Sequence, residues 1–232
     1  MCASVFSQEA EFYQASQLYK NGAYGEAIAK YESILEAGKA SGPLYYNLGN
    51  CYFKEGNLGK AILNYMRAKK LLPRDSDVDF NLNYALSQIK YKSNSPEDGI
   101  LKKLFNTYSG YFTLDEIMRI ILMTYFLICL YFLIGLFLRW PRNRLIGPIG
   151  LLCIVLIFNF CVFIHGIHKY SQLVVAVEDI EARFEPIENA TVHFKLSEGN
   201  TATILENKDG WIKIRRLDGK VGWTESHTIE SI

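Results

Sequence analysis

Aromatic, amide and lysine side chains recur between residues 12 and 88 in three groups that could together hold an extended peptide. An asparagine amide both donates and accepts hydrogen bonds, so it can pair with a peptide backbone, while aromatic rings contact side chains and lysine meets a carboxylate. The groups are Phe12, Tyr13, Ser16, Tyr19 and Lys20; Tyr46, Asn47, Asn50, Phe53 and Lys54; and Phe80, Asn81, Tyr84 and Gln88. Many of these rings could instead pack within a helical core, but Asn47 and Asn81 are harder to explain in that way.

A repeat of 34 residues relates the first two groups, because residues 8–41 align with residues 42–75. The matched positions are small or aromatic, as required where two antiparallel helices touch: Ala15/Gly49, Leu18/Tyr52, Gly22/Gly56, Ala27/Ala61, Ile28/Ile62 and Tyr31/Tyr65. Gly22 and Gly56 lie where one helix must turn into the next. This pattern resembles the tetratricopeptide repeat (TPR), a helix–turn–helix unit of this length. The second copy fits the motif better than the first, where Lys39 replaces the usual proline; the matching residues of the second copy are Tyr45, Leu48, Gly49, Tyr52, Gly56, Ala61, Tyr65, Ala68 and Pro73.

A third helical segment is expected over residues 75–91, with Asp75 as its N-cap. The helical domain thus spans residues 8–92 and holds two repeats and one capping helix. In a TPR solenoid the first helix of each pair lines the concave face, and in this register that face carries the three groups above. Three repeats are usually needed for a stable stack, so this shorter one is expected to need help from a partner or from the membrane-proximal segment.

Charge and composition exclude several other kinds of chemistry. The chain has 25 Lys+Arg against 24 Asp+Glu, which argues against a nucleic-acid binder. The sequence contains no nucleophile elbow, no zinc-protease helix motif, no phosphate-binding loop and no paired cysteines. We therefore expect no catalytic residue, no metal and no cofactor.

Two long apolar runs predict a transmembrane hairpin. The first span is expected over residues 117–138 and the second over residues 145–167, after a linker or interfacial segment at 93–116. Whether that segment lies along the headgroups or is an ordinary connector stays open. Asn159, deep in the second span, is the best candidate for a transmembrane contact between spans or between subunits.

The loop at 139–144 places three arginines between the spans, and short basic loops stay in the cytoplasm. Both flanking domains then face the periplasm of a bacterium. Exporting the helical domain requires a signal, and residues 1–7 have the small residues of a signal-peptide end, so we interpret them as its remnant.

After residue 170 the apolar pattern changes to a period of two, which indicates short strands at 173–177, 191–196, 202–205 and 211–214. Tight turns and about 60 residues favour a small barrel. The segment from Asp218 to Trp223 resembles the end of bacterial SH3-like domains. Trp211 and Trp223 could line a ligand groove for a peptide or wall glycan; alternatively, one of them, by preference Trp211, closes the barrel core.

The whole order describes a multi-domain membrane protein: an all-α TPR solenoid, a transmembrane helical hairpin and an all-β SH3-like barrel. This order resembles the BatE-type proteins of the bacterial Bat aerotolerance operon. The resemblance implies an inner-membrane protein acting beside von Willebrand A-type membrane proteins and a MoxR-type ATPase system, with a role in stress or oxygen tolerance.

Two functional hypotheses follow. The first is a non-enzymatic scaffold that is anchored in the lipid bilayer and binds partner proteins through both soluble domains. The alternative is an envelope attachment protein whose SH3-like domain binds peptidoglycan while the TPR recruits an enzyme. An enzyme or transporter would need more clustered ionisable groups than the spans contain.

Overall fold

The computed structural model describes residues 2–90 and 99–232. The chain forms two compact units, one of residues 1–97 with 171–232 and the other of residues 98–170. Of the predicted segments, Met1 and residues 91–98 lie outside the described residues; the rest of the predicted signal-peptide remnant falls in the first helix.

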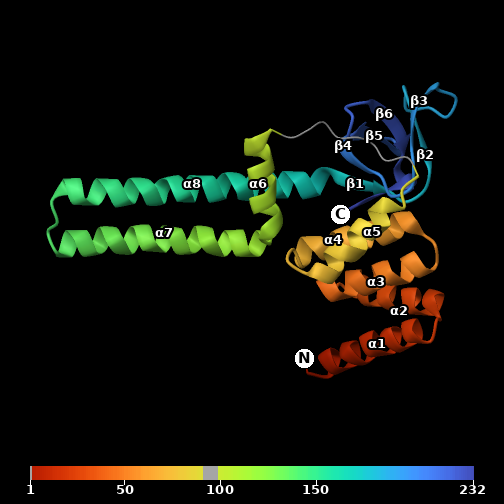
Figure 1. Ribbon diagram of the computed structural model, residues 1–232, viewed down its shortest axis with the longest axis horizontal. Coiled ribbons are helices and arrows are strands. Elements are labelled where there is room, and N and C mark those ends of the chain that lie inside the picture. Colours follow the sequence, from red (N-terminus) through yellow and green to blue (C-terminus); the bar gives the residue numbers. More distant parts are fainter. Residues whose placement is uncertain (1, 91–98) are drawn as a thin grey trace. The chain divides into compact units, whose positions relative to one another are not determined.

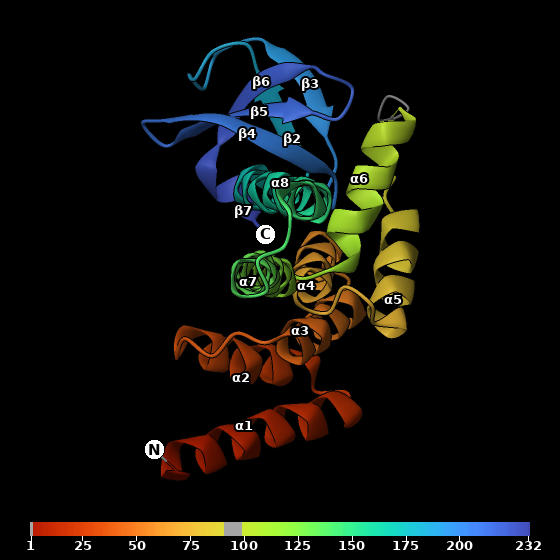
Figure 2. The same cartoon turned by 90° about the vertical axis from the view of Figure 1, so that its left-hand side faces the viewer.

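Five helices build the N-terminal part of the first unit, and Figure 2 shows them as successive layers. They are α1 (Cys2–Lys20), α2 (Tyr24–Glu36), α3 (Gly42–Lys54), α4 (Leu58–Leu71) and α5 (Ser76–Ser87). The N-termini of α3, α4 and α5 are capped by side chains: Ser41, Asn57 and Asp75 each accept a hydrogen bond from a backbone N–H in the first turn of the helix that follows.

Small residues let the helices approach closely at the positions that the repeat predicts. Ala15, Ala27 and Ala61 are fully buried in one cluster with Tyr31 and Tyr65. Gly22 and Gly56 have φ of +80° and +81°, so these two turns use the left-handed backbone that glycine adopts without strain. The predicted repeat geometry is therefore present in both turns.

The third helical segment begins as predicted but is shorter than predicted. Asp75 Oδ1 accepts from the N–H groups of Asp77 (3.0 Å) and Val78 (3.1 Å). The helix α5 ends at Ser87, not near residue 91. Beyond it, Ile89 packs against the helical core and lies beside Gly199.

The C-terminal part of the first unit is an antiparallel sheet in the order β3-β2-β6-β5-β4-β1-β7. Its strands are β1 (Leu173–Ala176), β2 (Ile180–Arg183), β3 (Val192–Leu196), β4 (Thr201–Lys208), β5 (Trp211–Arg216), β6 (Val221–Glu225) and β7 (Ile229–Ser231), with a 3-10 turn at Ser226–Thr228. The four predicted strands are all present. Strands β2, β6 and β7 were not predicted as separate strands.

Apolar side chains alternate with polar ones along the strands, and those on one face of the sheet pack into a single core. Ile212 and Ile214 of β5 are buried in it together with Val174, Phe194 and Leu196. The β4–β5 turn at Asp209 and Gly210, with φ of +48° and +83°, gives the tight hairpin that the Asp-Gly pair favours.

The second unit contains α6 (Ile100–Tyr111), α7 (Leu114–Phe137) and α8 (Arg142–Gln172). Thr113 and Glu116 form a capping box that starts α7. Figures 1 and 2 both show α7 and α8 side by side, and glycines allow this approach at each end, since Gly135 lies against Leu145 and Gly166 against Leu114. Both helices are long and apolar enough to cross a membrane.

Candidate functional site

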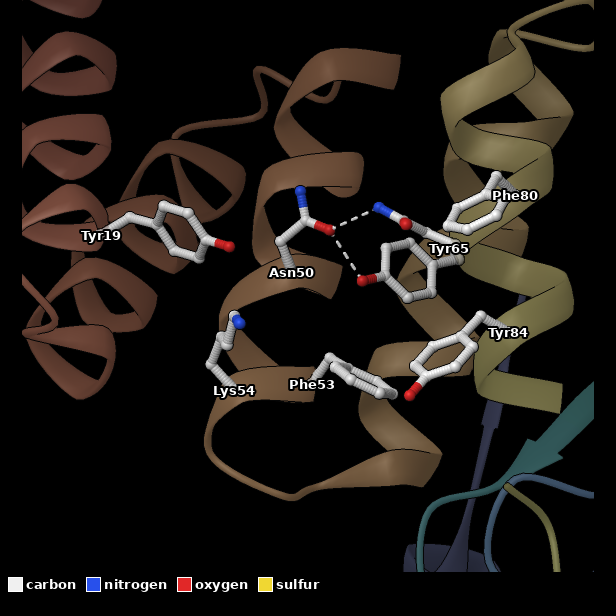
Figure 3. A pocket seen from close by; sticks show the side chains of 8 residues that line it. Tyr19, Asn50, Phe53, Lys54, Tyr65, Phe80 and Tyr84 are labelled. Carbon is white, nitrogen blue, oxygen red and sulfur yellow. Dashed lines mark hydrogen bonds between the residues drawn. The ribbon is translucent and has the colours of Figure 1, made fainter. Parts of the chain in front are cut away.

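A cavity of about 370 Å³ opens between the helices of the N-terminal stack (Figure 3). We call it the groove and define it by its lining residues, Tyr19, Asn50, Phe53, Lys54, Tyr65, Phe80, Asn81 and Tyr84. Four helices contribute: α1 through Tyr19, α3 through three residues, α4 through Tyr65, and α5 through three residues. The groove thus draws on both repeats and on the capping helix.

A hydrogen-bond network fixes the two amides of the groove. Asn50 Oδ1 accepts from the Tyr65 hydroxyl at 2.7 Å and from Asn81 Nδ2 at 3.0 Å (Figure 3). Asn81 Nδ2 also donates to the Tyr46 hydroxyl at 2.9 Å. Within the described residues, no hydrogen-bond partner is found for Asn50 Nδ2 or Asn81 Oδ1, so the NH2 group of Asn50 and the amide oxygen of Asn81 remain for a ligand.

Aromatic rings form the apolar walls of the groove. Phe80 and Tyr84 on α5 are 71% and 52% exposed. The ring centroids of Phe53 and Tyr84 lie 5.6 Å apart. An exposed aromatic pair beside free amide groups is a surface that suits the side chains and backbone of a bound segment.

The charge of the groove is positive. Lys54 is exposed and is the one charged residue of the lining; its ammonium has no ion-pair partner in the described part of the chain. Burial raises the pKa of Tyr65 and of Tyr19, so both hydroxyls stay neutral donors at any physiological pH. The groove therefore favours a neutral or acidic ligand over a basic one.

The structure brings seven of the predicted peptide-binding residues to the groove and places the others around it. Phe12 packs against the core with its ring 5.5 Å from that of Tyr31, and Ser16 hydrogen bonds to the Tyr31 hydroxyl at 2.9 Å. Asn47 also acts on Tyr31: burial raises the pKa of this tyrosine, and its contacts with Ser16 and Asn47 oppose that rise. Asn81 hydrogen bonds to Asn50, whereas Asn47 lies by Tyr31.

The remaining predicted residues lie outside the lining. Tyr13, Lys20 and Gln88 are exposed, and Tyr46 supports the network from behind as the acceptor for Asn81. Tyr65 was predicted only as a packing residue of the repeat. Its hydroxyl could have been suspected, because a buried tyrosine needs a polar partner and Asn50 is the nearest amide in the preceding helix.

The two tryptophans of the sheet have different environments, and the expected core position of Trp211 was wrong. Because Ile212 and Ile214 point into the core, the alternation along β5 turns Trp211 to the opposite face. Trp211 is half-buried and lines a cavity of about 270 Å³. Trp223 is the buried one, 8% exposed, with Lys213 Nζ 5.4 Å from its ring centroid. The register of β5 with β6 places Trp223 opposite Lys213, so both tryptophans lie on the same face of the sheet, and of the two Trp211 lines this cavity.

Asn159 in α8 contacts a different helix from the one expected. It is 3% exposed, and its Oδ1 accepts from the Tyr108 hydroxyl of α6 at 2.8 Å. Its Nδ2 donates to Val155 O at 2.9 Å. The amide joins α8 to α6, in a cluster with Phe105 and Phe158, rather than to α7.

Comparison with known proteins bears on the helical stack. Residues 43–75 match the tetratricopeptide repeat family, so the chain contains a TPR at α3 and α4. This repeat is generally a protein-interaction motif, and no catalytic family is indicated. The chain is 35% identical over 94 residues to the mouse mitochondrial import receptor subunit TOM34 and 34% identical to the rat protein of that name. Each alignment covers 34% of this chain and 30% of the relative.

Proposed function

We propose that this protein is a non-enzymatic scaffold whose groove binds a segment of a partner protein. The observation that carries the proposal is the pair Asn50–Asn81, which is fixed by Tyr65 and Tyr46 and leaves the NH2 group of Asn50 and the amide oxygen of Asn81 without a partner in the described residues. The aromatic walls and Lys54 suit a neutral or acidic segment with an apolar side chain. The TOM34 relatives, named as receptor subunits, agree with protein partners in general.

We further propose that α7 and α8 anchor the chain in a lipid bilayer. Their outward side chains are apolar and exposed over nearly the whole length of both helices, including Leu122, Phe126, Leu151 and Ile154. An apolar surface of that size is unfavourable in water, whereas in a bilayer the lipid chains solvate it. The arginines at 139–144 would stay in the cytoplasm and leave both soluble domains in the periplasm at a bacterial inner membrane.

The order of the parts supports a BatE-like place in a Bat-type complex linked to stress or oxygen tolerance. In that setting the partners would be von Willebrand A-type membrane proteins and a MoxR-type ATPase system. The C-terminal sheet would then be an SH3-like barrel that serves as the second binding module.

Copurification from membranes tests the scaffold proposal. Asn81→Ala removes one of the two amides of the groove, and Asn83→Ala on the exposed side of α5 is a matched control. Tagged full-length protein should recover a partner, Asn83→Ala should recover as much, and Asn81→Ala should recover about tenfold less. Equal recovery with both variants would place the contact elsewhere on the chain.

The half-buried Trp211 supports the alternative function, envelope attachment. It lines its cavity with His227 and several carboxylates, which could bind peptidoglycan. Full-length protein in detergent should then sediment with purified sacculi, and Trp211→Ala should stay in the supernatant. Sedimentation that is unchanged by Trp211→Ala would count against this alternative.

A further inference from the structure

Strand β1 is buried on both of its faces, although only one face belongs to the sheet core. Val174 and Ala176 are part of that core. Val175 instead belongs to the core of the helical stack, where it is fully buried, and Val177 packs against the same cluster. Since successive side chains of a strand point to opposite faces, β1 joins two hydrophobic cores.

Hydrogen bonds secure this contact at the start of α4. The backbone N–H of Gly59 donates to Glu198 Oε1 at 2.6 Å. Gly59 N is among the first N–H groups of the helix, which have no partner inside the helix, so a residue of the sheet supplies the acceptor. A carboxylate at this position also interacts favourably with the helix dipole.

The far end of α4 contacts the last strand. Arg67 Nη2 donates to Ser231 O at 2.7 Å and lies 3.4 Å from Glu230 Oε2. Lys70 Nζ donates to Ile232 O at 3.2 Å, and the side chain of Ile232 packs against the helical core. The sheet therefore contacts α4 along most of its length.

Two glycines at this contact leave no room for a side chain. A Cβ on Gly59 would lie 2.7 Å from Ala176 O and 2.8 Å from Val177 Cα. A Cβ on Gly199 would lie 2.5 Å from Ile62 Cδ1, and its φ of +82° also favours glycine. Backbone therefore meets backbone at α4, which indicates a fitted interface rather than a loose one.

We propose that the C-terminal sheet is a built-in cap of the TPR stack, and that the groove folds only when the sheet is docked on α4. The stack has two repeats and one further helix, fewer than such a stack usually needs. The sheet supplies the missing burial through Val175, Val177 and Ile232. Helix α4 carries Tyr65 toward the groove and Gly59 and Arg67 toward the sheet, so docking fixes the groove wall.

Two reporters in the full-length protein can follow the two parts separately. Cys51 is fully buried in the helical core, so with the other four cysteines replaced by alanine its reaction with a maleimide reports opening of the stack. With Trp140→Phe, tryptophan emission comes only from Trp211 and Trp223 in the sheet. In a urea titration in mild detergent, the two signals should change at the same midpoint.

Gly59→Ala tests the contact, and Gly25→Ala in α2 is the matched control because a Cβ there meets nothing within 4 Å. Overpacking at Gly59 should raise the labelling rate of Cys51 about ten- to hundredfold without urea and should lower both midpoints together. Gly25→Ala should leave the rate unchanged or lower it. If Gly59→Ala lowers only the midpoint of the sheet and Cys51 stays protected, the proposal is wrong.

A charge exchange keeps the test decisive if Gly59→Ala fails to fold. Arg67→Glu should speed the labelling of Cys51 severalfold, and adding Glu230→Arg should restore part of the protection. Two separate midpoints in the parent protein, or a labelling rate of Cys51 that is unchanged by Arg67→Glu, would show that the stack folds without its cap.

Discussion

Two asparagine–tyrosine pairs in this chain have the same hydrogen bond and opposite surroundings. Tyr65 donates to Asn50 Oδ1 at 2.7 Å in the groove, and Tyr108 donates to Asn159 Oδ1 at 2.8 Å in the second unit. Asn159 is almost fully buried and uses its amide N–H on Val155 O. Asn50 is half-buried, and its N–H groups have no partner in the described residues.

The difference teaches which amide is available for binding. A buried amide whose oxygen and nitrogen both hydrogen bond inside the protein, as in Asn159, stabilises its own fold and is not accessible to a ligand. An amide that is held by its oxygen, with its nitrogen free at a surface, is oriented for a partner at little cost to stability. We therefore propose a structural role for Asn159 and a binding role for Asn50 and Asn81.

The largest expected effect on stability is at Tyr108. Tyr108→Phe leaves Asn159 Oδ1 without its donor in an apolar site, which should cost about 1–3 kcal/mol. Adding Asn159→Leu removes the orphaned amide and should recover most of that loss. Hydrogen exchange over residues 100–111 measures the loss in Tyr108→Phe and the recovery in the double variant. Equal exchange in the two variants would show that Asn159 does not need its donor, and its role would then not differ from that of Asn50.

At Asn50 we expect a small effect on stability and a large effect on partner binding. Asn50→Ala should change the free energy of unfolding by less than about 1 kcal/mol, because the Tyr65 hydroxyl and the Asn81 amide that lose their acceptor line the groove, where water can take its place. Partner recovery should nevertheless fall about tenfold. Asn50→Asp, which places a carboxylate beside Lys54, should reduce recovery of an acidic partner further. A large loss of stability in Asn50→Ala would mean that this amide is structural as well.

Cys51 follows Asn50 in the chain but is fully buried in the helical core, whereas Asn50 lines the groove. Burial raises the pKa of its thiol to about 12. A raised pKa stabilises the fold below the ordinary thiol value of about 8.5, and this contribution is lost as the pH rises from there toward 12. With Cys51 as the only cysteine, maleimide labelling should stay slow through pH 9; fast labelling at pH 8 would show that the core is open.

The smallest effect is expected at an exposed pair of the sheet. Arg216 Nε donates to Asp218 Oδ1 at 2.9 Å, and Arg216 lowers the pKa of Asp218 to about 2. A lowered pKa stabilises the fold above the ordinary value of about 4, and this contribution is lost as the pH falls toward 2. Since water screens the pair, Asp218→Asn should cost less than about 0.5 kcal/mol at pH 7 in a urea titration followed by tryptophan emission.

Much of the helical fold could be predicted because its signals are local. The repeat places Gly22 and Gly56 at the two turns, and Asp75 indicates a helix start. The groove was predicted only in part, since Tyr65 was expected as a packing residue of the repeat, whereas its hydroxyl donates to Asn50 in the groove. The repeat pattern does not specify which hydrogen bonds form between helices.

The contacts between distant segments could not be predicted from periodicity. The apolar run at 173–177 indicates a strand that is buried on both faces, but it does not say what covers the second face. The helical stack supplies that cover through residues more than 100 positions earlier. In the same way, the alternation along β5 decides the orientation of Trp211 only once Ile212 is known to point inward.

The claim that the groove binds a protein segment is tested most directly by photocrosslinking in cells. Benzoylphenylalanine at position 84 keeps an aromatic ring in the groove wall, and the same residue at position 13 samples an exposed tyrosine site outside the lining. We predict one discrete crosslinked partner from position 84 that disappears with Asn50→Asp, and none from position 13. Equal crosslinking from both positions, or a product from position 84 that survives Asn50→Asp, would contradict the account.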